Sequence, residues 1–65
     1  MNRGDINKFV GKDVTVDFQG SDAEMANASG KLVDIDDEGI TLDYGKGVVD
    51  IPIVFIRRVE LNKYE

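Results

Sequence analysis

The segment GKLVDIDDEGITLDYG, Gly30 to Gly45, contains two apolar runs separated by three acidic residues and a glycine. Both runs alternate apolar and polar residues, which is typical of half-buried β-strands. Acidic residues and glycine are common in the tight turns that join such strands. The segment therefore predicts a β-hairpin with Asp36–Gly39 at its tip, and we expect Gly39 to adopt the positive φ that closes the turn.

The same acidic residues partly match a calcium-binding loop. The first, third, fifth and sixth positions of such a loop are matched by Asp34, Asp36, Glu38 and Gly39. Its twelfth position requires a bidentate glutamate, but this chain has Gly45 there. The flanking runs also alternate as strands, whereas a calcium loop lies between helices. We therefore expect a turn that binds no metal ion.

Strand patterns continue on both sides of this hairpin. Residues 13–18 (DVTVDF) alternate strictly, so Val14, Val16 and Phe18 share one face. Each remaining strand segment is bounded by Gly, Asp or Asn, and these segments are residues 30–36, 39–45, 47–51 and 57–63. Residues 19–30 are small and polar and predict a loop, in which Ser21 and Glu24 could form a capping box.

The single proline predicts how the chain enters its last strand. Pro52 cannot donate a backbone hydrogen bond, so the strand over residues 47–51 should end near it. Residues 51–56 (IPIVFI) are then expected to form a one-turn 3₁₀ corner. In that corner Ile53 and Ile56 would cover the end of a barrel.

A short helix is expected before the first strand. Ile6, Phe9 and Val10 have helical spacing, Asp5 is a candidate N-cap, and Gly11 is a candidate stop. Together the elements predict an all-β fold over residues 1–65, a five-stranded antiparallel SH3-like small barrel with one short N-terminal helix. The expected core is Phe9, Val14, Val16, Phe18, Leu32, Ile35, Ile40, Leu42, Ile51, Ile56, Val59 and Leu61.

The composition narrows the classes of function. The 65 residues carry a net charge of −5 and include neither cysteine nor histidine. The chain thus lacks thiolate metal ligands and the commonest general base, and its serines and threonines lie in no nucleophile motif. Its longest apolar run, residues 51–56, is too short to span a bilayer. We expect a cytoplasmic, non-catalytic protein that requires no cofactor or metal and does not associate with membranes.

Several of these motifs resemble the Sm-like family of small barrels. The Sm pattern of glycine, leucine two residues later and aspartate four residues beyond is matched by Gly30, Leu32 and Asp36, and Ile56 followed by Arg57 resembles its last motif. The chain is also similar to the C-terminal domain of the RimP-type ribosome maturation factor, in its V-x-V first strand, its G-x-L second strand and its I-(basic)-(basic)-x-x-L ending. These resemblances imply an Sm-like fold and a role near RNA or ribosomes.

The loop that follows Asp36 departs from the RNA-binding members of that family. Those members typically carry a Met-Asn pair in the loop and an Arg-Gly pair in the last hairpin. Here the loop reads Asp37, Glu38, Gly39, and Arg58 stands where the glycine would be. An acidic loop in that place would repel phosphate.

The charge distribution leaves two functions open. Residues 13–50 hold ten acidic residues against two lysines, whereas the basic residues gather near the chain ends. The first hypothesis is a protein-interaction or assembly module, a monomer or weak homo-oligomer that docks a protein partner through its strand edges. The alternative is an RNA- or ribosome-associated module, whose candidate contact residues are Lys8, Lys12, Arg57 and Arg58. The acidic net charge favours the first hypothesis.

Overall fold

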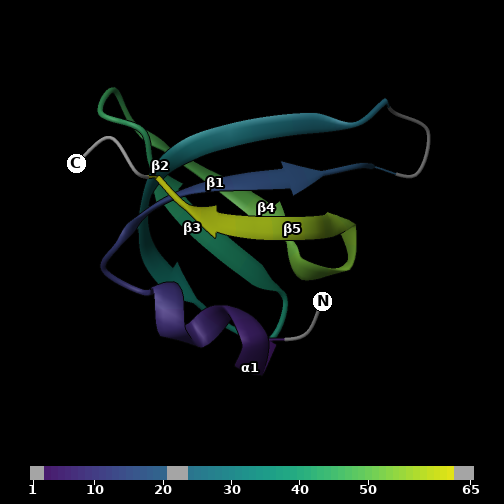
Figure 1. The fold of residues 1–65 in the computed structure, drawn as a ribbon, viewed down its shortest axis with the longest axis horizontal. Helices are drawn as coiled ribbons and strands as arrows, with labels where there is room; N and C mark the ends of the chain where they lie inside the picture. The colour runs from purple at the N-terminus through teal and green to yellow at the C-terminus, as the bar shows by residue number, and fades with distance from the viewer. Residues whose placement is uncertain (1–2, 21–23, 63–65) are drawn as a thin grey trace.

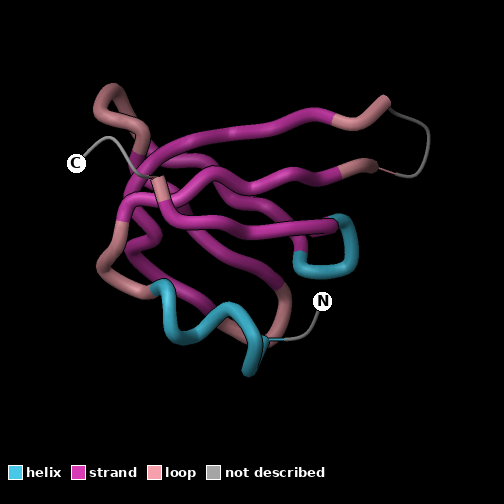
Figure 2. Tube along the Cα trace, viewed as in Figure 1, coloured by secondary structure: helices cyan, strands magenta, loops and turns pink. Residues whose placement is uncertain are grey.

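The computed structural model describes residues 3–20 and 24–62, which form a five-stranded sheet with one short helix before it (Figure 1). The strands are β1 (Asp13–Phe18), β2 (Ala26–Ile35), β3 (Gly39–Asp43), β4 (Val48–Pro52) and β5 (Ile56–Leu61). Helix α1 (Arg3–Ile6) continues into the 3₁₀ turn η1 (Asn7–Phe9), and a second 3₁₀ turn, η2 (Ile53–Phe55), joins β4 to β5 (Figure 2). These elements confirm the predicted helix, the five strands and the 3₁₀ corner.

The strands follow the order β4-β3-β2-β1-β5, and every neighbouring pair is antiparallel. Figure 1 shows a curved sheet, with α1 lying across its lower side. The sheet is not closed into the predicted barrel, since β4 and β5 stand at the two ends of the strand order. A closed barrel would need β4 and β5 to pair with each other as well. Here the chain leaves β4 through the corner η2, and among the described strands β5 pairs with β1 alone.

Strand β2 is longer than its sequence pattern suggests. The first half of β2 was expected to be loop, but residues 26–30 pair with β1, from Phe18↔Ala26 to Val14↔Gly30. Pairing with β3 begins only at Lys31. The two halves of β2 therefore have different neighbours, and the β1–β2 hairpin extends beyond β3 (Figure 1). Ser21, half of the candidate capping box, lies outside the described residues.

The core consists of side chains from the helix and from all five strands. The buried residues are Ile6, Val14, Val16, Leu32, Ile40, Leu42, Ile51, Ile56 and Val59. Phe9, Phe18 and Ile35 pack against this cluster but stay partly exposed. Leu61 was predicted to be buried and is 47% exposed, because it occupies the last position of β5, beyond the packed interior.

The helix begins earlier than its capping pattern predicts. It begins at Arg3, so Asp5 lies in its first turn instead of capping it. Gly11 has a φ of +88° and turns the chain out of η1, as expected of a stop. Its backbone N–H then donates to the Leu32 carbonyl (2.7 Å), which fastens this turn to β2. Within the described ranges, no helix is long and apolar enough to cross a bilayer.

Candidate interaction edges of the sheet

Strand β4 is the outermost strand on one side of the sheet. Tyr44 N–H donates to the Gly47 carbonyl (3.1 Å), and Ile53 N–H donates to the Glu38 carbonyl (2.8 Å). Hydrogen-bonded pairs alternate along an antiparallel ladder, so between these two pairs the backbone groups of residues 49 and 51 face β3. The backbone groups of residues 48, 50 and 52 consequently face away from the sheet.

Pro52 therefore occupies an outward-facing position of this edge. Its φ of −61° suits the pyrrolidine ring, and β4 ends at this residue, which confirms the expected end of the strand. Because the missing N–H would have pointed away from β3, proline costs the β3–β4 ladder no hydrogen bond. Within residues 3–20 and 24–62 no strand pairs with the outer side of β4, so this edge presents two N–H donors, from Val48 and Asp50, and three carbonyl acceptors.

Strand β5 forms the other outermost edge. Asn62 N–H donates to the Asp13 carbonyl (3.0 Å), so by the same alternation Arg58 and Glu60 direct their backbone groups to β1. Val59 and Leu61 direct theirs away from the sheet. A register shift opposite Asp17 interrupts this strand near its start. The regular part of the β5 edge is therefore short.

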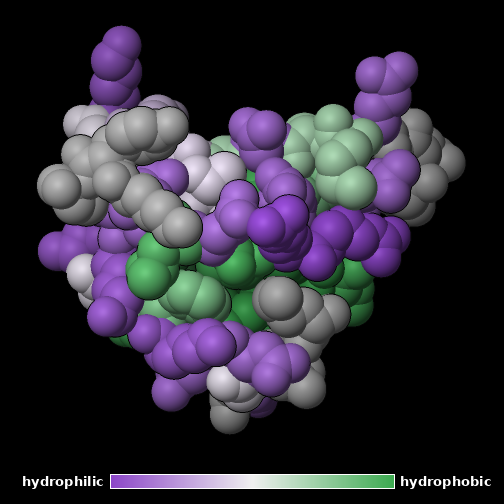
Figure 3. Space-filling model, in the orientation of Figure 1, coloured by the Kyte–Doolittle hydropathy of each residue, from purple (hydrophilic) through white to green (hydrophobic). Residues whose placement is uncertain are grey.

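Exposed apolar side chains accompany both edges. Val48 on β4 is 61% exposed, Val54 in η2 is 74% exposed, and Leu61 closes β5. Figure 3 shows hydrophobic residues in a band between hydrophilic ones on the face where β5 lies. An extended partner at either edge would thus meet apolar side chains as well as backbone groups.

The acidic residues between β2 and β3 form the predicted hairpin tip. Asp36 N–H donates to the Gly39 carbonyl (2.9 Å), and the Asp36 carboxylate accepts the N–H groups of Glu38 (2.8 Å) and Gly39 (2.9 Å). Gly39 does not have the expected positive φ. Glycine is required there for a different reason, since a Cβ would collide with the carbonyl oxygen of Ile51 on β4.

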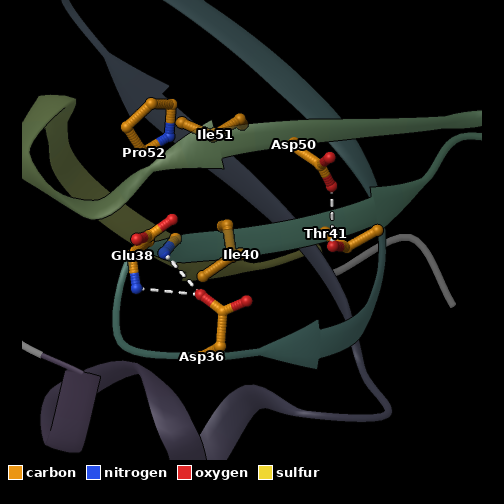
Figure 4. A pocket seen from close by; sticks show the side chains of 8 residues that line it. Asp36, Glu38, Ile40, Thr41, Asp50, Ile51 and Pro52 are labelled. Carbon is orange, nitrogen blue, oxygen red and sulfur yellow. Dashed lines mark hydrogen bonds between the residues drawn. The ribbon is translucent and has the colours of Figure 1, made fainter.

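An acidic depression lies beside this tip, on the outer face of β3 and β4 (Figure 4). It measures about 280 Å³ and is lined by Asp36, Glu38, Gly39, Ile40, Thr41, Asp50, Ile51 and Pro52. In the β3–β4 register, Gly39 lies opposite Pro52 and shares its face with Thr41. The Thr41 hydroxyl donates to the Asp50 carboxylate (2.8 Å), which orients that carboxylate.

The chemistry of this acidic depression is that of a cation-attracting surface. Three of its eight lining residues are acidic and none is basic. Among the described residues, no group of three or more carboxylates is arranged to hold a metal ion. The Asp36 carboxylate instead accepts hydrogen bonds from the turn backbone.

The structure does not gather the four candidate basic residues into one patch. Lys12 immediately precedes β1, at the end of the strand where the Asp13 carbonyl accepts the Asn62 N–H. Arg58 instead pairs with Asp17, near the other end of β1. Five residues of strand separate these positions by about 17 Å. Lys8 lies in η1 with its Nζ 5.4 Å from the centroid of the Phe9 ring, a cation–π contact.

The two arginines lie beside acidic residues. The Arg58 guanidinium donates to the Glu60 carboxylate (2.6 Å), with side-chain exposures of 65% and 50%. Asp17 faces Arg58 across the β1–β5 register, and Arg57 is exposed on the same strand. The β5 edge is therefore mixed in charge, while the β4 edge is acidic. Sequence reasoning predicted that β4 ends near Pro52 but missed the acidic depression. The residues that line the depression come from the hairpin tip, β3 and β4 and meet only through the β3–β4 register, so no local sequence pattern indicates it.

Comparisons of this chain with known proteins assign it to no family. No protein-family model, no curated protein and no solved structure matches this chain. The resemblance to Sm-like proteins and to the RimP-type factor therefore rests on the sequence motifs alone.

Proposed function

We propose that this protein is a non-catalytic interaction module, which binds an extended segment of another protein by adding it as a strand to a free edge of the sheet. The observation that carries this proposal is the outward-facing backbone of β4 at Val48, Asp50 and Pro52. Strand addition uses such groups for affinity, and it uses the flanking side chains for specificity. The exposed side chains of Val48 and Val54 supply apolar contacts there.

The fold proposed for this module is an Sm-like small barrel left open between β4 and β5. Support comes from where the Sm-like motif residues lie. Gly30 stands where β2 passes close to β3, Leu32 is buried in the core, and Asp36 caps the hairpin tip. Each of the three motif residues thus stabilises the fold, as expected if the resemblance to Sm-like proteins reflects a shared fold.

The absence of catalysis is part of the proposal and is supported by the chemistry of the surface. The acidic depression and a wider one of about 460 Å³, lined by Asp13, Ser29, Gly30, Lys31, Asp43, Tyr44, Gly45 and Asn62, both open to solvent. The chain contains neither histidine nor cysteine, so the side chains on these surfaces that could exchange a proton or act as a nucleophile are carboxylates, a lysine and hydroxyls. None of the carboxylates that line these surfaces is buried, and burial is one of the ways in which enzymes adapt a carboxyl group to acid–base catalysis.

The RNA-associated alternative rests on the exposed side chains of Lys12 and Arg57. It is the weaker proposal, because Arg58 is paired with Glu60 and the basic residues are spread over the molecule. A protein of net charge −5 also gains little sequence-independent affinity for phosphate.

Capture experiments with proline variants test the proposed function. Asp50→Pro and Leu61→Pro each remove an outward-facing N–H, from β4 and β5 respectively, and their controls Asp50→Ala and Leu61→Ala keep it. The tagged wild-type protein should retain a non-ribosomal protein from an extract of its native cells. One proline variant should retain much less of that protein than its alanine control, which keeps the backbone donor.

The contrary result is equally specific. Recovery of RNA or ribosomal proteins by both proline variants, with loss in Arg57→Ala, would establish the RNA-associated alternative. Self-association is a further check. Sedimentation at tens of micromolar should show a monomer or a weak dimer, whereas a stable hexamer or heptamer would refute strand addition of a foreign partner.

A further inference from the structure

We propose that β4, and not β5, receives the partner, and that the added segment is a basic strand with lysine or arginine at alternate positions. This inference rests on the proposed function and specifies its partner. Its basis is the difference in charge between the two free edges. Between residues 32 and 56 the chain has six acidic residues and one basic residue, Lys46. Strand β5 instead carries two arginines and a glutamate.

The β4 edge combines its backbone groups with carboxylates on one face. In the register, Asp50 lies beside Thr41 and Val48 beside Asp43, with both aspartates on the outer face. The acidic depression continues this face toward Glu38. An added strand that formed hydrogen bonds with the backbone groups of residues 48 and 50 would therefore run alongside several carboxylates. No basic residue lines the depression next to it.

The dimensions favour long basic side chains. An added strand would lie about 4.8 Å beyond β4, and β3 lies the same distance further in. Lysine and arginine side chains are long enough to cross β4 and reach the acidic depression on the outer face of β3 and β4. The Asp50 carboxylate is already oriented by Thr41, so less side-chain freedom is lost when a cation binds.

The same features would reject an acidic strand. Like charges on directly opposed strands are destabilising, and a carboxylate placed in the depression would meet Glu38 and Asp50. Pro52 limits the docking register as well, because it offers a carbonyl acceptor without a donor. The β4 edge therefore selects the charge of its partner and the place where pairing stops.

Two synthetic peptides test the inference, one alternating lysine with valine and one alternating glutamate with valine. Each is titrated into the ¹⁵N-labelled protein at low and at high ionic strength. The basic peptide should shift the amide signals of Val48 and Asp50, and the acidic peptide should not. Salt should weaken the binding of the basic peptide, because exposed charges are screened.

Charge variants separate the contribution of the depression from that of net charge. Glu38→Gln should weaken binding of the basic peptide about 2- to 5-fold, the size expected for one exposed charge pair. Glu60→Gln changes the net charge equally but lies on β5, so it should leave binding unchanged. Asp50→Pro should weaken binding at least ~10-fold, beyond the effect of Asp50→Ala, since it removes a backbone donor. If Asp50→Pro does not fold, a basic peptide with N-methyl groups at alternate backbone positions tests the same inter-strand hydrogen bonds. This peptide should bind the wild-type protein more weakly than the unmethylated basic peptide does.

The contrary outcomes distinguish this inference from the proposed function. If the acidic peptide binds and Leu61→Pro abolishes that binding, the docking site is β5. This result would overturn the inference of a basic strand at β4 but would leave the proposal of strand addition intact. Equal binding of the basic peptide by the wild type and Glu38→Gln, independent of salt, would also overturn the inference alone. If neither peptide shifts any edge amide and neither proline variant loses the captured protein, both proposals are wrong.

Discussion

Replacing Gly30 with alanine tests the close passage of β2 over β3. A Cβ at this position would lie 2.6 Å from the carbonyl oxygen of Asp43, 3.0 Å from its carbonyl carbon and 3.2 Å from the Cα of Tyr44. All three are backbone atoms, so no side-chain rotation relieves the contact. Overpacking of this kind costs about 1–3 kcal/mol. The lower entropy of the unfolded alanine chain offsets about 0.4–1 kcal/mol of that cost.

We therefore expect Gly30→Ala to lower the free energy of unfolding by about 1–2 kcal/mol. With a urea m-value of about 1 kcal/mol per molar for a chain this small, the unfolding midpoint should fall by about 1–2 M. The melting temperature should fall by about 4–16 °C.

Gly47→Ala is the matched control for this experiment. Its Cβ would meet only the Tyr44 hydroxyl, at 3.5 Å, and the adjoining ring carbon, at 3.9 Å. Neither Gly30 nor Gly47 has a positive φ, so alanine meets no left-handed backbone strain at either position. Gly47→Ala should be neutral or slightly stabilising. Equal urea midpoints for the two variants would refute the close passage of β2 over β3.

Three further predictions follow from the core and the hairpin tip. Leu32→Ala should lower the free energy of unfolding, measured in urea, by about 2–5 kcal/mol because Leu32 is fully buried. Leu61→Ala should lower it by less than about 1 kcal/mol, and similar losses for the two variants would contradict the burial pattern. Asp36→Ala should lower the free energy of unfolding by about 1 kcal/mol, since two turn N–H groups lose their acceptor. Asp36→Asn should retain most of that stability because its amide oxygen still accepts hydrogen bonds. Millimolar calcium should not raise the melting temperature relative to EDTA, although calcium at ~100 times its dissociation constant would stabilise a binding site by about 2.7 kcal/mol. A clear calcium-dependent rise would show that the acidic tip is a metal site.

Local chemistry made the elements of this protein predictable. Strict alternation identified β1 to the residue, and the acidic residues before Gly39 identified the first hairpin. Pro52 indicated the end of an edge strand, because a missing N–H acts on the backbone whatever the rest of the fold. These features depend on near neighbours along the chain, and near neighbours are what a sequence displays.

The functional edges depended on the tertiary structure. Residues 26–29 became strand only because β1 lies beside them, which no local propensity records. The β3–β4 register decided that Asp50 directs its backbone outward and that Thr41 and Asp50 line the acidic depression from neighbouring strands. The β1–β5 register likewise separated Lys12 from Arg58.

Alternation along the sequence identifies the face on which a side chain lies, but the choice of partner strand and register is settled by packing between distant segments. A shift of one residue in that register would exchange inward and outward groups along the whole edge. Local patterns along the chain were therefore enough to predict that five strands exist, where β4 ends and which residues form most of the core. Packing between distant segments settled which backbone groups of the edge strands point outward and which charges surround them.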